Sequence, residues 1–166
     1  MESPFMIIPD TVFTEIRRLG FDTSPFIYFV ERHPVYLPMI RDIIRRIDEG
    51  IIKGYGSVIT LTEVLVYPRR EGKISLENEY RDILQNSRNF ELVPISAGVA
   101  DQASELRSRH NLRTPDALQI TAVLSVGCEA FLTNDKKLKH VDDLRIIVLD
   151  DYLPEIRKEK DIHFLT

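Results

Sequence analysis

Cysteine is nearly absent from this chain of 166 residues, in which Cys128 is the only one. One cysteine cannot form a disulfide within the chain, and its place in the segment SVGCEAFLT predicts a buried strand rather than redox or metal chemistry. The 4 histidines include no pair at i, i+4 and no cysteine partner, so their spacing disfavours zinc. A metal bound by this chain is therefore expected to have oxygen ligands.

Long hydrophobic runs and excess positive charge are also missing. No segment approaches the roughly 18 consecutive apolar residues of a membrane-spanning helix. The first segment, MESPFMIIPDT, has Glu2 where a secretory signal has basic residues, and its apolar stretch ends at Pro9. These features predict a cytoplasmic protein with no membrane partner. The formal net charge of -4 argues against binding long nucleic acid by bulk charge alone, but it does not exclude a nuclease.

Repeats, low-complexity tracts and Gly/Ser linkers are absent as well, and 166 residues suit one domain with a substantial core. The spacing of apolar residues predicts helices at 37–50, 61–68, 75–85, 96–110 and from 114 onward, and strands at 55–60, 90–95, 128–133 and 144–150. Strands that alternate with helices predict an α/β protein with a parallel sheet between two layers of helices.

Four acidic residues stand after predicted strands or in the first turn of a predicted helix. In open α/β sheets, ligands bind beyond the carboxyl ends of the strands, so acids in such places are candidates for a common site. The candidates are Asp22 in FDTSPF, Glu63 in ITLTEVL, Asp116 in RTPDAL and Asp135 in FLTNDKKL.

Each acid also has a local structural explanation. Asp22 and Asp135 can act as helix caps or turn formers. Glu63 completes a capping box with Thr60, three residues before it. These explanations account for each acid singly, but Ser, Thr or Asn would serve as well in a capping role.

The helix that begins in RTPDALQIT shows the same ambiguity. Thr114 can cap it, Pro115 suits its first position, and Asp116 favours the helix dipole. Four carboxylates brought to one sheet edge would instead repel one another unless a cation neutralised them. Convergence on a cation would explain why acids occupy all of these positions.

The absence of thiolate and histidine pairs makes Mg²⁺ or Mn²⁺ the expected cation. Both ions prefer oxygen ligands and commonly share their coordination between protein carboxylates and substrate phosphates. One such ion, or two that lie about 4 Å apart, would activate water and stabilise charge on an attacked phosphate. The residues therefore predict phosphodiester cleavage without a covalent nucleophile.

The segments FDTSPFIYFVE, ITLTEVL, TPDALQITAV and FLTNDKKL, in this order, closely resemble the PIN-domain ribonucleases. The resemblance implies a three-layer α/β/α sandwich with a mainly parallel five-stranded sheet, and an acidic site that binds Mg²⁺ or Mn²⁺ for RNA hydrolysis. It divides the chain into an N-terminal extension at 1–19, a PIN-like nuclease domain at 20–152 and a C-terminal tail at 153–166. The segment TEIRRLG is more polar than the usual first strand of the family, which predicts a short first strand or one that the extension helps to complete.

Motif matching carries the catalytic positions of the family over to the four acids, Asp22, Glu63, Asp116 and Asp135. We expect the three aspartates to bind metal directly or through water, and Glu63 to help orient water at the metal. Ser24 and Thr133 match polar positions that commonly support the acids. Basic candidates for holding phosphate are Arg107, Arg109, Arg113 and Lys136, although surface solvation explains each of them as well.

Many small members of this family are toxins of bacterial or archaeal toxin–antitoxin pairs, usually dimeric and inhibited by the antitoxin. The resemblance therefore implies an endoribonuclease toxin with RNA as substrate, an antitoxin as partner and a homodimeric state. The alternative is a non-catalytic PIN-like module that binds RNA or protein. A receiver domain would need a lysine after the last strand, where IIVLDDYL has acids, and a haloacid-dehalogenase-type phosphatase would need a second Asp in DTSPF.

Overall fold

A five-stranded sheet in the order β3-β2-β1-β4-β5 forms the centre of the computed structural model, which describes residues 7–154. All neighbouring strands run parallel. The strands are β1 (Arg18–Phe21), β2 (Lys53–Ser57), β3 (Phe90–Val93), β4 (Ala130–Thr133) and β5 (Arg145–Val148). The chain adds β2 and β3 on one side of β1, and then adds β4 and β5 on the other side. The order of the strands therefore reverses between β1 and β4, and α/β proteins bind ligands beyond the carboxyl ends of the strands at such a switch point.

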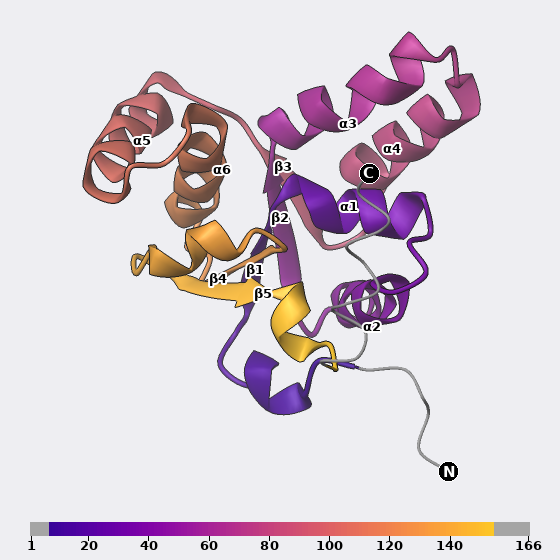
Figure 1. Cartoon of the computed structure of the whole chain (residues 1–166), viewed down its shortest axis with the longest axis horizontal. Helices are drawn as coiled ribbons and strands as arrows, with labels where there is room; N and C mark the ends of the chain where they lie inside the picture. The colour runs from indigo at the N-terminus through magenta and orange to yellow at the C-terminus, as the bar shows by residue number, and fades with distance from the viewer. Residues whose placement is uncertain (1–6, 155–166) are drawn as a thin grey trace.

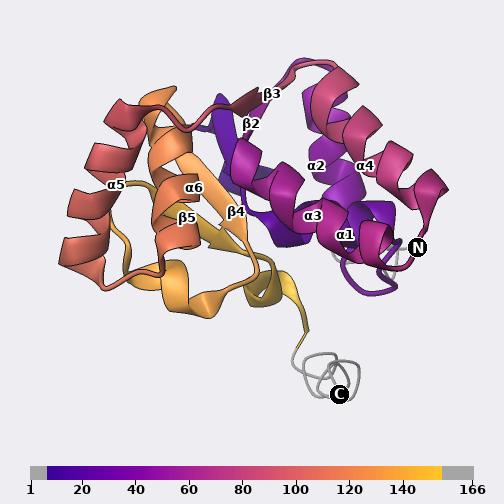
Figure 2. The same ribbon diagram turned by 90° about the horizontal axis from the view of Figure 1, so that it is seen from above.

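Helices cover both faces of this sheet, which confirms the predicted α/β/α sandwich (Figures 1 and 2). One face carries α1 (Thr23–Val30), α2 (Leu37–Asp48), α3 (Val58–Arg70) and α4 (Ile74–Asn86), and the other carries α5 (Ala97–His110) and α6 (Thr114–Ser125). Short 3-10 helices lie before β1, after β4 and after β5, at Asp10–Phe13, Lys136–His140 and Leu149–Tyr152. Within residues 7–154, no helix is long and apolar enough to cross a bilayer.

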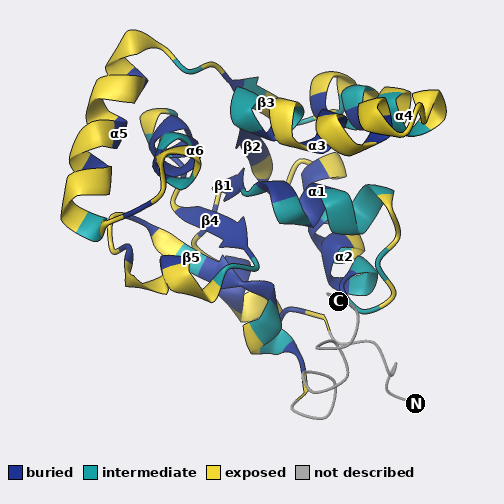
Figure 3. Ribbon diagram, turned by 45° about the horizontal axis from the view of Figure 1, so that its top comes forward, coloured by how far each residue is buried: buried dark blue, intermediate teal, exposed yellow. Residues whose placement is uncertain are grey.

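Local sequence explains most of these elements. In α2, Ile40, Ile43 and Ile47 are buried at helical spacing, and Gly50 ends the turn that follows with a φ of 75°. Every residue of β4 is buried, as expected for a parallel strand covered on both faces (Figure 3). β1 approaches α6 so closely that a Cβ atom on Gly20 would lie 2.6 Å from the Val123 side chain.

Part of the predicted N-terminal extension packs into the core of the chain. Ile8, Val12 and Phe13 are buried, and the Arg145 guanidinium donates a hydrogen bond to the Val12 carbonyl at 2.9 Å. β1 itself has only 4 residues, in line with the short first strand that the polar segment predicts. The domain boundaries stay a prediction. Of the predicted C-terminal tail, residues 155–166 lie outside the described residues.

Some predicted boundaries are wrong. α3 begins at Val58 instead of residue 61, because Ser57 Oγ accepts the Ile59 N–H at 3.2 Å and caps the helix three residues early. The predicted capping box is therefore not formed, and Thr60 lies inside the helix. Cys128 is buried as expected, but it precedes β4 rather than belonging to it.

The cap of α6 also differs from the prediction. Thr114 is the first helical residue instead of the cap, and the cap position belongs to Arg113, whose side chain makes no capping hydrogen bond. Pro115 follows within the first turn, where its missing N–H costs no intrahelical hydrogen bond.

Candidate active site

Asp22 lies directly after β1, at the switch point of the sheet, and caps α1. The Thr23 N–H donates to Asp22 Oδ1 at 2.8 Å, and the Thr133 hydroxyl donates to Oδ2 at 2.7 Å. Burial raises the pKa of Asp22, these two hydrogen bonds lower it, and the negative charges of Asp116 and Glu63 raise it again, with a net increase. The switch point therefore holds a largely buried carboxylate that is close enough to two other acids to be repelled by them.

Thr133, the last residue of β4, connects Asp22 to Asp135. Its side chain is fully buried, and the oxygen that donates to Asp22 also accepts the Asp135 N–H at 3.0 Å. Asp135 Oδ1 in turn accepts the Lys137 N–H at 3.0 Å and caps the 3-10 helix that follows. One hydroxyl thus contacts two acids that follow adjacent strands.

Glu63 lies on α3, beyond the first turn of the helix. The sequence predicted it in the first turn, because the start of the helix was expected at residue 61. Its Oε1 accepts hydrogen bonds from the Thr23 hydroxyl at 3.0 Å and from Gln119 Nε2 at 2.8 Å. The Thr23 and Thr60 hydroxyls lie 3.1 Å apart, and both are buried beside Gln119. Residues from α1 and α6 therefore hold one oxygen of Glu63, and Oε2 has no hydrogen bond to the described residues.

Asp116 lies in the first turn of α6 with a side chain that is 12% exposed. Arg113 Nε donates to its Oδ2 at 3.0 Å, and Arg113 Nη2 donates to its Oδ1 at 3.4 Å. Asp116 and Asp135 line one pocket of about 290 Å³ together with Arg113, Lys137 and His140. The hydrogen bonds and charge of Asp116 raise the pKa of Arg113, and the charges of Asp135 and Glu63 contribute to the increase.

The structure therefore brings all four predicted acids to the carboxyl end of the sheet, and we call Asp22, Glu63, Asp116 and Asp135 the acid site. Of the two predicted supporting residues, Thr133 contacts the acids directly. The Ser24 side chain makes no hydrogen bond with the described residues. The catalytic, metal-binding and supporting roles of these six residues stay predictions.

Three buried polar residues lie around Glu63, namely Thr23, Thr60 and Gln119, and only Thr60 was singled out from the sequence, as a helix cap. Their relation to Glu63 depends on contacts between helices that are distant in sequence. The one available signal was Gln119 itself, a polar side chain within the apolar spacing of ALQITAV.

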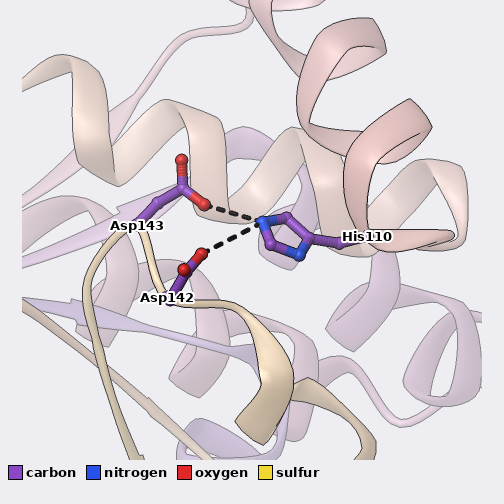
Figure 4. Close-up of side chains that lie close together, drawn as sticks. All are labelled: His110, Asp142 and Asp143. Atoms are coloured by element: carbon purple, nitrogen blue, oxygen red, sulfur yellow. Dashed lines mark hydrogen bonds and ion pairs between the residues drawn. The ribbon is translucent and has the colours of Figure 1, made fainter.

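A second cluster of possible ligands lies outside the acid site (Figure 4). Among residues 7–154, His110, Asp142 and Asp143 form the only group of three or more His, Cys, Asp or Glu whose ligand atoms all lie within 4.8 Å of one another. Arg109 already donates to Asp143 Oδ2 at 2.8 Å, and His110 Nε2 lies 2.8 Å from Oδ1. The hydrogen bond from Arg109 and then that from His110 lower the pKa of Asp143. These contacts are accounted for by an ion-pair network that ties α5 to the loop before β5.

The donors of the acid site fit a hard divalent cation. They are carboxylate oxygens, and each Asp22 oxygen retains lone-pair capacity beyond the one hydrogen bond that it accepts. A cation would also relieve the repulsion that Asp116 and Glu63 exert on Asp22. Unlike the residues of the second cluster, no three of the four acids have ligand oxygens that all lie within 4.8 Å of one another. This wider spacing suits Mg²⁺ or Mn²⁺, because these ions keep several water ligands that can lie between the ion and a carboxylate.

Comparison with known proteins agrees with this architecture. Solved structures with similar folds include VapBC2 from Rickettsia felis bound to a promoter DNA fragment, with a TM-score of 0.65 and 17% identity over 79% of this chain and 98% of that chain. A second is a toxin–antitoxin complex from Klebsiella pneumoniae, with a TM-score of 0.60 and 22% identity over 80% of this chain and 97% of that chain. A third is FitAcB from Neisseria gonorrhoeae, with a TM-score of 0.59 and 18% identity over 80% of this chain and 97% of that chain. A comparison with curated proteins finds no match. The PIN domain family matches residues 21–144, and the chain therefore belongs to that family.

Proposed function

We propose that this protein is a divalent-metal-dependent endoribonuclease that acts as the toxin of a toxin–antitoxin pair. The observation that carries the proposal is the arrangement of Asp22, where a partly buried carboxylate at the switch point receives hydrogen bonds and lies within electrostatic reach of two further acids. Membership of the PIN domain family supports the same chemistry. The acid site offers oxygen ligands for Mg²⁺ or Mn²⁺ and contains no nucleophilic thiol.

In this proposal, Asp22, Asp116 and Asp135 hold the cation, directly or through water. When bound, the cation supplies a Lewis acid that activates water and offsets charge on the attacked phosphate. Glu63 orients the attacking water, because Thr23 and Gln119 hold its carboxylate in place. The water oxygen bonds to phosphorus as the water gives up a proton to solvent. The bond to the leaving ribose oxygen breaks, this oxygen takes up a proton from solvent, and no covalent enzyme intermediate forms.

The experiment that tests this function is cleavage of a mixed pool of single-stranded and structured RNA by the purified full chain. Parallel reactions contain Mg²⁺, Mn²⁺ or EDTA, and we expect cleavage with either metal and none with EDTA. Cleavage that persists in EDTA would contradict metal dependence. RNA binding without cleavage in both metals would instead favour the alternative, a non-catalytic PIN-like binding module.

We infer that the partners are an antitoxin and a second copy of the chain. The solved complexes with this fold include named toxin–antitoxin assemblies, which supports an antitoxin. Val66 and Tyr67 on α3 and Ile74 on α4 are large apolar residues that are 48%, 45% and 69% exposed, on the helix pair that lies at one end of the molecule in Figure 2. Light scattering should give the mass of a dimer for the wild type and of a monomer for Val66→Asp; a monomeric wild type would contradict the homodimer.

A further inference from the structure

We propose that Arg113 neutralises Asp116 in the metal-free protein and transfers its guanidinium to a substrate phosphate when a divalent cation binds the acid site. The inference rests on the proposed function, because it takes Asp116 as a metal ligand and a phosphodiester as the substrate. It assigns Arg113 a role in substrate binding that depends on the state of the metal site.

The two members of the Arg113–Asp116 ion pair differ in how far they are exposed, and Arg113 is the one with room to move. Asp116 is held in the first turn of α6 and is 12% exposed, whereas the Arg113 side chain is 77% exposed. Arg113 reaches both oxygens of the carboxylate, which are the atoms that a metal would need. Its side-chain hydrogen bonds to the described residues all go to Asp116, so no other hydrogen bond or ion pair in residues 7–154 would have to break for it to leave.

The charges around the pair give a reason for the exchange. The Arg113 guanidinium is attracted by Asp116, Asp135 and Glu63, and it therefore supplies positive charge where several carboxylates meet. A divalent cation on the same carboxylates would bring more positive charge and would repel the guanidinium. An exposed ion pair contributes little free energy, so a cation with several ligands can displace it.

The pocket beside the pair provides a destination for the released guanidinium. Arg113, Asp116, Asp135 and Lys137 line the same pocket of about 290 Å³. A guanidinium binds phosphate oxygens through two parallel N–H groups, and Lys137 adds a second cation that forms no ion pair with the described residues. A phosphodiester in this pocket would therefore contact both basic residues next to the acid site.

The other predicted phosphate-binding arginines are less available. Arg109 is paired with Asp143, and Arg107 Nε donates to the Leu112 carbonyl at 2.8 Å. The first contact joins α5 to the loop before β5, the second joins α5 to the segment that follows it, and neither involves an acid of the acid site. Among the arginines predicted to hold phosphate, Arg113 alone contacts a proposed metal ligand within the described part of the chain.

The first test is calorimetric titration of Mn²⁺ into the metal-free full chain. We expect Arg113→Ala to bind Mn²⁺ roughly two- to fivefold more tightly than the wild type, because an exposed competing ion pair is removed. Lys136→Ala is the matched control: it removes the same charge next to Asp135 without breaking an ion pair of the described residues, and its effect should be smaller. An affinity for Arg113→Ala no higher than that of Lys136→Ala would overturn the proposal.

The second measurement is binding of an oligonucleotide analogue in which a methylene group replaces the leaving ribose oxygen of each linkage, so that hydrolysis cannot occur; binding is followed by fluorescence anisotropy. Mn²⁺ should tighten its binding to the wild type by at least about fivefold, and Arg113→Ala should lose most of this coupling. Equal coupling in the two proteins would overturn the role of Arg113. If Asp116→Asn binds Mn²⁺ as well as the wild type, or the wild type binds none, the proposed metal site itself is wrong. Loss of Mn²⁺ binding in Asp116→Asn with normal coupling in Arg113→Ala would refute only the exchange.

Discussion

Gln119 Nε2 donates a hydrogen bond of 2.8 Å to Glu63 Oε1 and so joins α6 to α3 beneath the acid site. Gln119 is 1% exposed, and the Thr23 hydroxyl donates to the same Glu63 oxygen. A hydrogen bond to a carboxylate is stronger than one between neutral groups. In the proposed function, Gln119 is therefore a positioning residue, which would act on the reaction through Glu63 without reaching the substrate.

Replacement of Gln119 by Met removes this donor while nearly preserving side-chain volume. We expect kcat for RNA cleavage to fall by roughly 10- to 100-fold, since hydrogen bonds to charged groups are worth about 1.5–3 kcal/mol. KM should change little, because Gln119 is buried. Single-turnover and steady-state kinetics, with circular dichroism to confirm folding, measure both quantities.

A double-mutant cycle separates positioning from a general loss of stability. If Gln119 acts through Glu63, Gln119→Met should cost little further activity in a Glu63→Gln background. Additive losses in kcat would show that Gln119 acts independently of Glu63.

The close contact between β1 and α6 gives a prediction for stability. A Cβ atom on Gly20 would lie 2.6–2.9 Å from three atoms of the Val123 side chain. Gly20→Ala should therefore lower the free energy of unfolding by about 1–3 kcal/mol, as overpacking does in other cores. Urea denaturation of Gly20→Ala, Val123→Ala and the double variant tests whether the clash with Val123 causes the loss of stability. The double variant should lose less than the sum of the single losses, and strict additivity would show that the clash is not the cause.

Several of these relationships could be predicted from sequence and others could not. The apolar spacing of Ile40, Ile43 and Ile47 locates α2, because helix formation depends on residues that are near one another in the chain. The start of α3 was misplaced because Ser57 and Thr60 are both suitable caps, and tertiary packing decides between them.

The four acids were predicted as a set, with Thr133 as a supporting residue, but the contacts that hold Glu63 were not predicted. A parallel sheet brings the carboxyl ends of β1 and β4 together, so Asp22 and Asp135 could be expected to meet. The hydrogen bonds of Gln119 link three helices and depend on side-chain packing that no local pattern encodes. Burial of Ile8 is likewise a long-range contact, and it was not predicted.

The pH dependence of stability should reveal the ion-pair network outside the acid site. Arg109 and His110 hold the pKa of Asp143 below its ordinary value of 3.8, so the stabilisation by Asp143 is present above 3.8 and disappears as pH falls through the lower folded-state value. Asp143→Asn should therefore lower Tm at neutral pH, and its difference from the wild type should shrink as the solution is acidified below 3.8. Scanning calorimetry across this range measures the difference. Asp101→Asn on the exposed surface of α5 is the control, and a constant difference for Asp143→Asn would contradict the prediction.

The most direct test of the account compares metal-dependent RNA cleavage by Asp116→Asn and Asp143→Asn under identical conditions. Each variant removes one carboxylate charge: Asp116→Asn removes it from the acid site, and Asp143→Asn removes it from the cluster of His110, Asp142 and Asp143. The account predicts that Asp116→Asn folds but loses Mn²⁺-dependent cleavage, while Asp143→Asn retains it below its Tm. Full cleavage by Asp116→Asn, together with its loss in folded Asp143→Asn, would contradict the account and locate the metal centre at His110, Asp142 and Asp143.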